Sequence, residues 1–206
     1  REQCSVFGKP WPLFGVVFGE IELTMAVLIE AISVVIKGTA VVERYPGGWE
    51  AFEADPPNPT LCADGELIRV GFMSPHDVEA FVNSLAIHGI KYQEDGKAVD
   101  VVVADQQRGL LFPCDWAECG QMSFGGDNDK MIMGCRLTGS KIQELVTPDG
   151  WNYDSSLSAK FVFVETGRES ERLEFLRSGN DLDVYRDLET GKEVFMGRSG
   201  ANPRDP

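Results

Sequence analysis

Apolar runs alternate along the chain with polar, turn-forming segments, and two stretches show the same succession. A β-branched run at residues 28–36 precedes a short helical or turn segment (39–45) that stops at a proline, and residues 98–104 begin the same series with the matching segment at 106–112. Such runs suit buried strands, and the residue before a proline is disfavoured in a helix. A second apolar strand is expected in each stretch, at residues 66–73 and 130–137.

We interpret this succession as an internal repeat of one β/α unit. Residues 32–53 align with residues 99–120, and residues 68–82 align with residues 132–146. Order, spacing and aromatic identity agree between the two copies. Independent convergence on the same β/α pattern is the alternative explanation.

A helix is expected to close each copy, and it is best marked in the first. Ser74 is a good N-cap, Pro75 suits the first helical position, and Gly89 supplies the stop. Apolar residues between them follow one helical stripe, namely Val78, Phe81, Val82 and Leu85. The second copy predicts a shorter helix that begins at residue 138 or 140 and ends before Pro148.

Turn signals complete the expected fold. Asp95 and Gly96 predict a hairpin that joins the copies in a continuous sheet. Farther along, the pattern predicts a strand at residues 160–165, a short helix at 171–176 and a hairpin that turns at residues 190–191. The expected fold class is therefore α+β, with two tandem pseudo-repeated β/α units sharing mostly antiparallel sheet.

The expected organisation has four parts in one compact body. Residues 1–24 form an N-terminal extension, because Met25 begins a run that resembles a natural protein start. The first repeat covers residues 25–93, the second covers 94–156, and a C-terminal β-α-ββ element covers 157–206.

Charge and cysteine content limit the partners and the compartment. The chain has 206 residues and a formal net charge of -14, which disfavours nucleic acid and anionic membrane surfaces and suits a basic protein. Solubility alone also explains an acidic chain. An odd cysteine count without a dense framework favours a reducing, cytoplasmic setting. The five cysteines are Cys4, Cys62, Cys114, Cys119 and Cys135.

The tryptophans that recur in the alignment are candidates for a binding site. Trp49 and Trp116 each follow a proline turn, and they are either the wall of a groove or repeated core residues. The second copy alone carries Asp105, Asp115 and Cys114 at the matching positions. With Glu118, the two aspartates form an acidic cluster, or else Asp105 caps a helix and the others are solvated.

Metal and catalytic signatures are weak. The cysteines at 114 and 119 have unusual spacing for zinc, and the two histidines, His76 and His88, lie near the ends of one predicted helix. A Cys–His nucleophilic pair would need assembly across the fold. The loop at residues 125–130 lacks the spacing of a calcium site and predicts a turn. Nucleotide-binding and common hydrolase motifs are absent from the sequence.

Two function classes follow. The first is a non-catalytic interaction or regulatory protein, such as an acidic inhibitor of a basic, nuclease-type toxin, which needs clustered carboxylates around aromatic residues. The second is a small-molecule binder or enzyme with a site between the repeats, formed by Trp49, Trp116, Asp105, Asp115 and Cys114. The balance favours the first, without cofactor or metal, as a monomer or homodimer.

Overall fold

The computed structural model describes residues 25–141, 144–160, 173–179, 182–188, 191 and 193–197. The described residues divide into two compact units. The first unit contains those up to residue 122 together with 132–151, and the second contains 123–131 together with those from residue 152 onward. The predicted extension at residues 1–24 lies outside the described residues, as does most of the strand predicted at 160–165.

A five-stranded sheet forms the centre of the first unit. Its middle strand is β2, which pairs antiparallel with β4 on one side and with β7 on the other. Short strands β3 and β8 form the two edges. The bounds are β2 (Ile32–Lys37), β3 (Cys62–Ala63), β4 (Leu67–Phe72), β7 (Val101–Asp105) and β8 (Gly109–Leu110).

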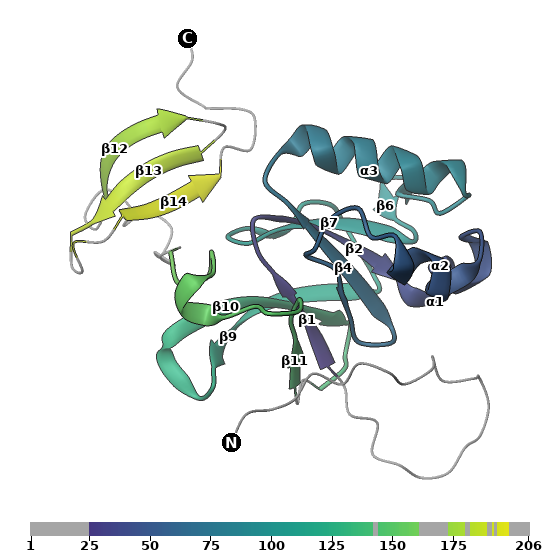
Figure 1. Ribbon diagram of the computed structural model, residues 1–206, viewed down its shortest axis with the longest axis horizontal. Helices are drawn as coiled ribbons and strands as arrows, with labels where there is room; N and C mark the ends of the chain where they lie inside the picture. Colours follow the sequence, from purple (N-terminus) through teal and green to yellow (C-terminus); the bar gives the residue numbers. More distant parts are fainter. Residues whose placement is uncertain are drawn as a thin grey trace. The chain divides into compact units, whose positions relative to one another are not determined.

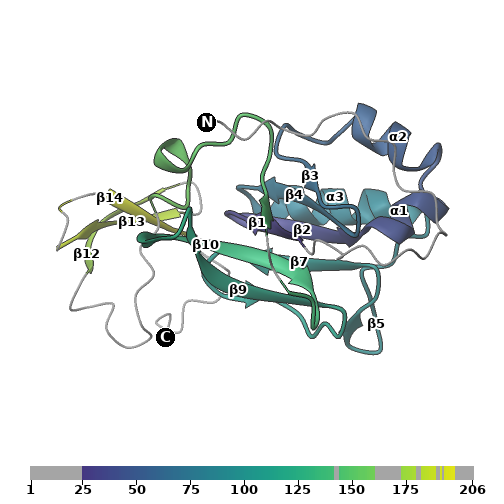
Figure 2. The ribbon, with the colours of Figure 1, turned by 90° about the horizontal axis from the view of Figure 1, so that it is seen from below.

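Three helices pack on one face of this sheet (Figure 1). They are α1 (Gly38–Arg44), α2 (Gly48–Ala54) and α3 (Pro75–Ile87), and α1 and α2 lie side by side (Figure 2). The Ser74 hydroxyl accepts a hydrogen bond from the His76 amide at 3.2 Å, and Pro75 is the first helical residue. These features confirm the predicted start of α3. Buried apolar residues join the helices to the sheet, among them Val41, Phe52, Val78, Leu85, Val34, Ile36 and Ile68.

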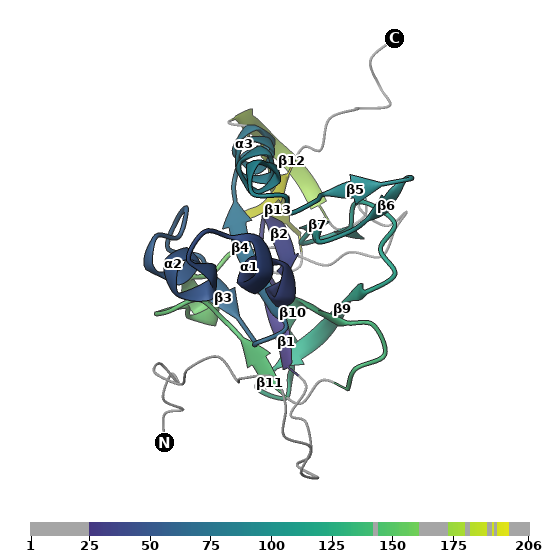
Figure 3. The same cartoon turned by 90° about the vertical axis from the view of Figure 1, so that its right-hand side faces the viewer.

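A second sheet has the strand order β11-β1-β10-β9. Figure 3 shows its strands and α3 on opposite sides of the five-stranded sheet. Strand β1 is central and fully buried at Ala26, Val27, Leu28 and Ile29. The bounds are β1 (Met25–Ile29), β9 (Ala117–Phe124), β10 (Asp127–Leu137) and β11 (Glu144–Val146).

The apolar run predicted as one strand at residues 28–36 forms two strands with a bend between them. Ala31 has a positive φ of 50°, in the left-handed region. Gln106 stabilises this bend through two hydrogen bonds. Its side-chain oxygen accepts from the Ala31 backbone N–H at 2.9 Å, and its backbone N–H donates to the Ala31 carbonyl at 2.9 Å. The bend allows β1 and β2 to enter different sheets.

Mixed helix and strand content confirms the α+β class, but the repeat is not confirmed. Residues 106–112 form a turn and β8, whereas the aligned segment of the first copy is α1. The helix predicted after residue 138 is wrong, because residues 144–146 form β11, which pairs in parallel with β1. Residues 144–146 form hydrogen bonds with the backbone edge of β1, and this pairing outweighs the helical spacing of their side chains.

Both turn predictions in this part of the chain are confirmed. Asp95 and Gly96 join β5 (Gln93–Glu94) to β6 (Lys97–Ala98), with φ of 50° and 78°. These two strands form a separate two-stranded sheet, so the turn is confirmed but the hairpin is not part of the five-stranded sheet. Positive φ at both positions is the requirement of a tight hairpin turn that asparagine, aspartate and glycine satisfy. Gly125 and Gly126 form the turn that connects β9 to β10, whereas residues 127–130, predicted as part of the same loop, belong to β10.

The second unit contains an antiparallel three-stranded sheet. Strand β12 (Leu173–Gly179) pairs with β13 (Leu182–Asp187), which pairs with β14 (Glu193–Gly197). The hairpin predicted around residues 190–191 is confirmed, and the helix predicted at 171–176 is wrong where residues 173–176 belong to β12. A short 3-10 helix covers Tyr153–Ser155. Among the described helices, none combines the length and apolar character that a membrane span requires.

Candidate functional site

An aromatic cluster lies in the helical layer of the first unit. The ring of Phe52, on α2, is central, with Tyr45 at 5.1 Å edge-on and Trp49 stacked at 6.3 Å. Phe81 of α3 lies 6.5 Å from Phe52, and Phe72 lies 5.3 Å from Phe81. Phe52 is buried, whereas the other four are half-buried. The cluster is therefore part of the core and also reaches the surface.

Exposed carboxylates accompany this cluster on the same three helices and the chain just after α2. We call them the acidic rim: Glu43, Glu50, Glu53, Asp55, Asp77 and Glu79. None of the six takes part in an ion pair within the described residues. Unpaired exposed carboxylates repel one another and create a negative potential that extends about one Debye length into solvent, roughly 8 Å at physiological salt.

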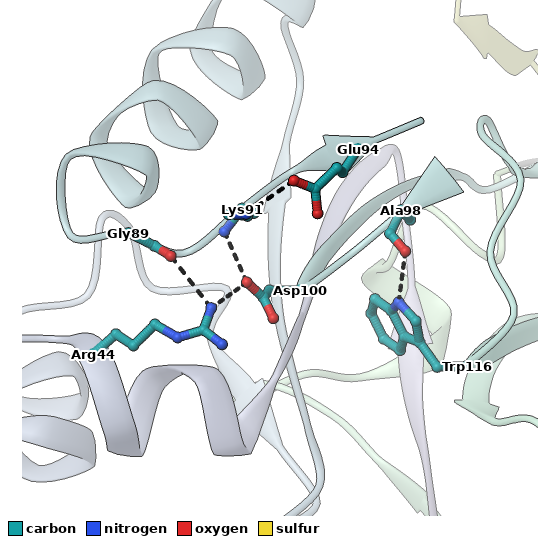
Figure 4. A network of polar contacts seen from close by, with 7 residues as sticks. All are labelled: Arg44, Gly89, Lys91, Glu94, Ala98, Asp100 and Trp116. Carbon is teal, nitrogen blue, oxygen red and sulfur yellow. Dashed lines mark hydrogen bonds and ion pairs between the residues drawn. The ribbon is translucent and has the colours of Figure 1, made fainter. Parts of the chain in front are cut away.

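Trp116 comes just before β9 in the sequence. In space it lies near the start of β7, close to Val101. Its indole N–H donates to the Ala98 carbonyl at 3.3 Å (Figure 4), and the Lys37 Nζ lies 4.9 Å from its ring centroid. Its neighbour Asp115 forms an exposed ion pair with Lys97 at 2.7 Å. Cys114 adjoins them in the sequence, so three of the predicted site residues lie together.

Asp105 and Glu118 do not extend this group into an acidic cluster. Asp105 ends β7, about 13 Å from Val101 at ordinary strand rise, and accepts hydrogen bonds from the amides of Gln107 and Arg108 at 2.9 and 3.0 Å. Glu118 forms its own ion pair with Arg136 at 2.8 Å. No group of three or more His, Cys, Asp or Glu in the described part of the chain could hold a metal ion.

Asp100 joins three segments of the first unit in a polar network (Figure 4). Its buried carboxylate forms an ion pair with Arg44 at the end of α1, and it accepts from the Lys91 amide at 2.9 Å. Arg44 also donates to the Gly89 carbonyl at 3.2 Å, and the Lys91 ammonium pairs with Glu94 at 3.1 Å. This network positions α1 against the chain that follows α3.

A second polar network, around Arg69, was not predicted from the sequence. This arginine is only 2% exposed, and it donates to Ser33 Oγ at 2.9 Å, to the Glu30 carbonyl at 2.9 Å and to the Thr60 carbonyl at 3.2 Å. Burial lowers the pKa of its guanidinium. A charged residue inside the apolar run of β4, two positions before Gly71, is the sequence signal that could have revealed it.

The buried Cys62 thiol is expected to make the protein less stable at alkaline pH. Burial raises the pKa of the Cys62 thiol from 9.0 to about 11. Between these values the folded protein keeps the proton and the unfolded chain loses it, so the free energy of unfolding falls as pH rises. We expect a loss of about 2 kcal/mol from pH 9 to pH 11 for this group.

Urea unfolding at pH 8, 9, 10 and 11, with a reducing agent present, measures this dependence. Cys62→Ala should flatten the slope between pH 9 and 11, whatever it costs at pH 8. An equal slope in the wild type and the variant would contradict the assignment to Cys62.

Comparisons with protein-family models, with curated proteins and with solved structures find no match to this chain.

Proposed function

We propose that the protein is a non-catalytic interaction protein whose helical layer binds a basic protein partner, as an acidic inhibitor does. The observation that carries the proposal is the acidic rim beside the half-buried aromatic cluster. Carboxylates steer a basic partner toward the surface, and aromatic rings at the centre of an interface contribute most of the binding energy in known complexes.

The charge distribution along the chain supports the helical layer as the binding face. Residues 38–87 contain eight acidic residues and only two basic ones, Arg44 and Arg69. Arg44 forms an ion pair with Asp100, and the Arg69 side chain is buried. Neither arginine therefore neutralises the acidic rim, and residues 38–90 contain no lysine.

Acidic side chains elsewhere more often have a cationic neighbour. Glu94, Asp115 and Glu118 each form an ion pair in the first unit. Within the second unit, Glu174 and Glu193 pair with arginines. A carboxylate that already contacts a cation attracts a basic partner less, so the unpaired rim favours the helical layer over these surfaces.

Two triple variants of equal charge test the proposal. One replaces three rim residues (Glu50→Lys, Glu53→Lys, Glu79→Lys), and the control replaces three exposed carboxylates outside the helices (Asp95→Lys, Glu144→Lys, Asp149→Lys). Binding of a fluorescent lysine-rich peptide would be measured by anisotropy at several salt concentrations. We expect the rim variant to bind at least about tenfold more weakly, and the control to change by less than about threefold.

Circular dichroism would confirm that both variants fold. Equal losses for the two folded variants would show that only net charge attracts the peptide, and they would refute a binding face on the helical layer. The lysine-rich peptide reports only the contribution of charge. The aromatic contribution is therefore tested by comparing how tightly the wild type and Trp49→Ala bind a folded basic protein.

A further inference from the structure

Cys119 and Cys135 lie opposite each other on neighbouring strands, β9 and β10. Just outside these strands, the Thr138 amide donates to the Trp116 carbonyl at 3.0 Å. In an antiparallel pair each step forward on one strand is a step backward on the other. The register that places residue 116 opposite residue 138 therefore places Cys119 opposite Cys135.

The neighbouring side chains agree with this register. Glu118 and Arg136, one step before the cysteines, form an ion pair at 2.8 Å. The bond between residues 138 and 116 marks a hydrogen-bonded pair, and such pairs alternate with non-hydrogen-bonded pairs along the ladder. The cysteines thus form a non-hydrogen-bonded pair, with Cα atoms about 4.5 Å apart, within the range of about 4.4–6.8 Å that disulfides bridge.

The two thiols differ in access to solvent. Cys135 is fully buried, whereas Cys119 is half-buried and lies against Gly109, where an added Cβ would be 3.6 Å from its own Cβ. The pKa of the Cys135 thiol is raised, chiefly by a hydrogen bond with Cys119 and then by burial, with a smaller electrostatic contribution from Cys114. A small oxidant would therefore meet Cys119 first, with Cys135 directly behind it.

We propose that Cys119 and Cys135 form a reversible cross-strand disulfide by exchange with a small-molecule disulfide. The Cys119 thiolate attacks one sulfur of the oxidant and releases one thiolate, which leaves a mixed disulfide. Cys135 loses its proton, attacks the Cys119 sulfur and releases the second thiolate. The two cysteines lose two electrons and two protons, and the oxidant is reduced to two thiols.

The bond would fix an edge of the second sheet. Strand β9 is the outermost strand of the order β11-β1-β10-β9, so its far side has no strand neighbour in that sheet. A disulfide to β10 closes a loop around the turn at Gly125 and Gly126 and restricts opening of this hairpin. The acidic rim lies on other elements, so this inference does not depend on the proposed function.

Peptide mapping of the full chain after treatment with oxidised glutathione tests the proposal. Free thiols are alkylated in denaturant, and the protein is cleaved after Lys, Arg and Glu. Cleavage after Glu118 separates Cys114 from Cys119, and cleavage at Lys130 and Arg136 isolates Cys135. We expect a linked peptide pair that contains Cys119 and Cys135, with a mass about 2 Da below the sum of the two reduced peptides.

Three serine variants examine the order of the steps. Cys119→Ser should leave Cys135 open to alkylation, Cys135→Ser should retain glutathione on Cys119, and the control Cys114→Ser should still form the link. Glutathione that stays on wild-type Cys119 would overturn the proposal, as would a link between Cys114 and Cys119. Mapping of the wild-type chain decides the question even where a variant fails to fold.

Discussion

Arg69→Met is expected to lower the free energy of unfolding by about 3–5 kcal/mol. Methionine keeps most of the apolar contact of the arginine stem, but it donates no hydrogen bond. Ser33 Oγ and the Thr60 carbonyl would then lose the donor that Arg69 supplies, and the Glu30 carbonyl would keep only the hydrogen bond from Ser33 Oγ. Urea unfolding followed by tryptophan fluorescence measures the loss.

Arg136→Met is the matched control for this variant. Arg136 also donates to a side-chain oxygen, that of Glu118, but its side chain is 32% exposed, so water can replace the lost contact. We expect a cost of at most about 1 kcal/mol. Similar losses for the two variants would show that burial of the Arg69 network contributes little.

Gly71 offers a second measurement of the same network. A Cβ at Gly71 would lie 2.8 Å from Arg69 Cζ, and three hydrogen bonds hold that guanidinium in place. Gly71→Ala should therefore cost about 1–3 kcal/mol in the wild type and clearly less in the Arg69→Met background. Additive losses in this double-mutant cycle would show that the guanidinium does not limit the space at Gly71.

Elements that are determined by residues close together in the chain were predicted correctly. The cap at Ser74, the proline after it and the apolar stripe determine α3, and the turn at Asp95 and Gly96 requires only the backbone freedom of its two residues. These features depend on residues a few positions apart. The sequence therefore contains the full physical cause, and the structure confirms both elements.

Elements that depend on distant partners were not predictable in the same way. Residues 140–146 have apolar positions at helical spacing, yet residues 144–146 form β11, because β1 offers an edge for pairing 119 residues earlier in the chain. The segment at residues 171–176 is too short for its spacing to separate a helix from a strand, and residues 173–176 form a strand through pairing with β13.

The candidate site shows the same limit. The sequence indicated that Trp49 and Trp116 are either core or surface residues, and the structure makes both half-buried. It could not indicate that the helices that carry these exposed carboxylates pack in one layer, since that depends on how α1, α2 and α3 contact the sheet. Nor could it show that Arg69 bonds to Ser33, 36 residues away in the chain, or that Asp100 pairs with Arg44, 56 residues away.

Asp100→Ala is expected to lower the free energy of unfolding by about 2–4 kcal/mol. The carboxylate side chain is 6% exposed and accepts from both Arg44 and the Lys91 amide. Its removal leaves a partly buried guanidinium without its counter-charge and the Lys91 amide without its acceptor. Only the hydrogen bond from Arg44 to the Gly89 carbonyl would then remain of this network between α1 and the chain that follows α3. Urea unfolding gives the total loss, and hydrogen exchange should show it concentrated at α1 and residues 89–91.

Asp115→Ala provides the matched control for Asp100→Ala, because it removes the same group from an ion pair in which the aspartate side chain is 74% exposed. Solvent already screens the Asp115–Lys97 attraction, so we expect a change within about 0.5 kcal/mol. A large loss for Asp115→Ala, or a small one for Asp100→Ala, would contradict the view that burial decides which ion pair stabilises this fold. Because Asp115 is also a predicted binding residue, a stable Asp115→Ala variant can then test binding without a change in folding.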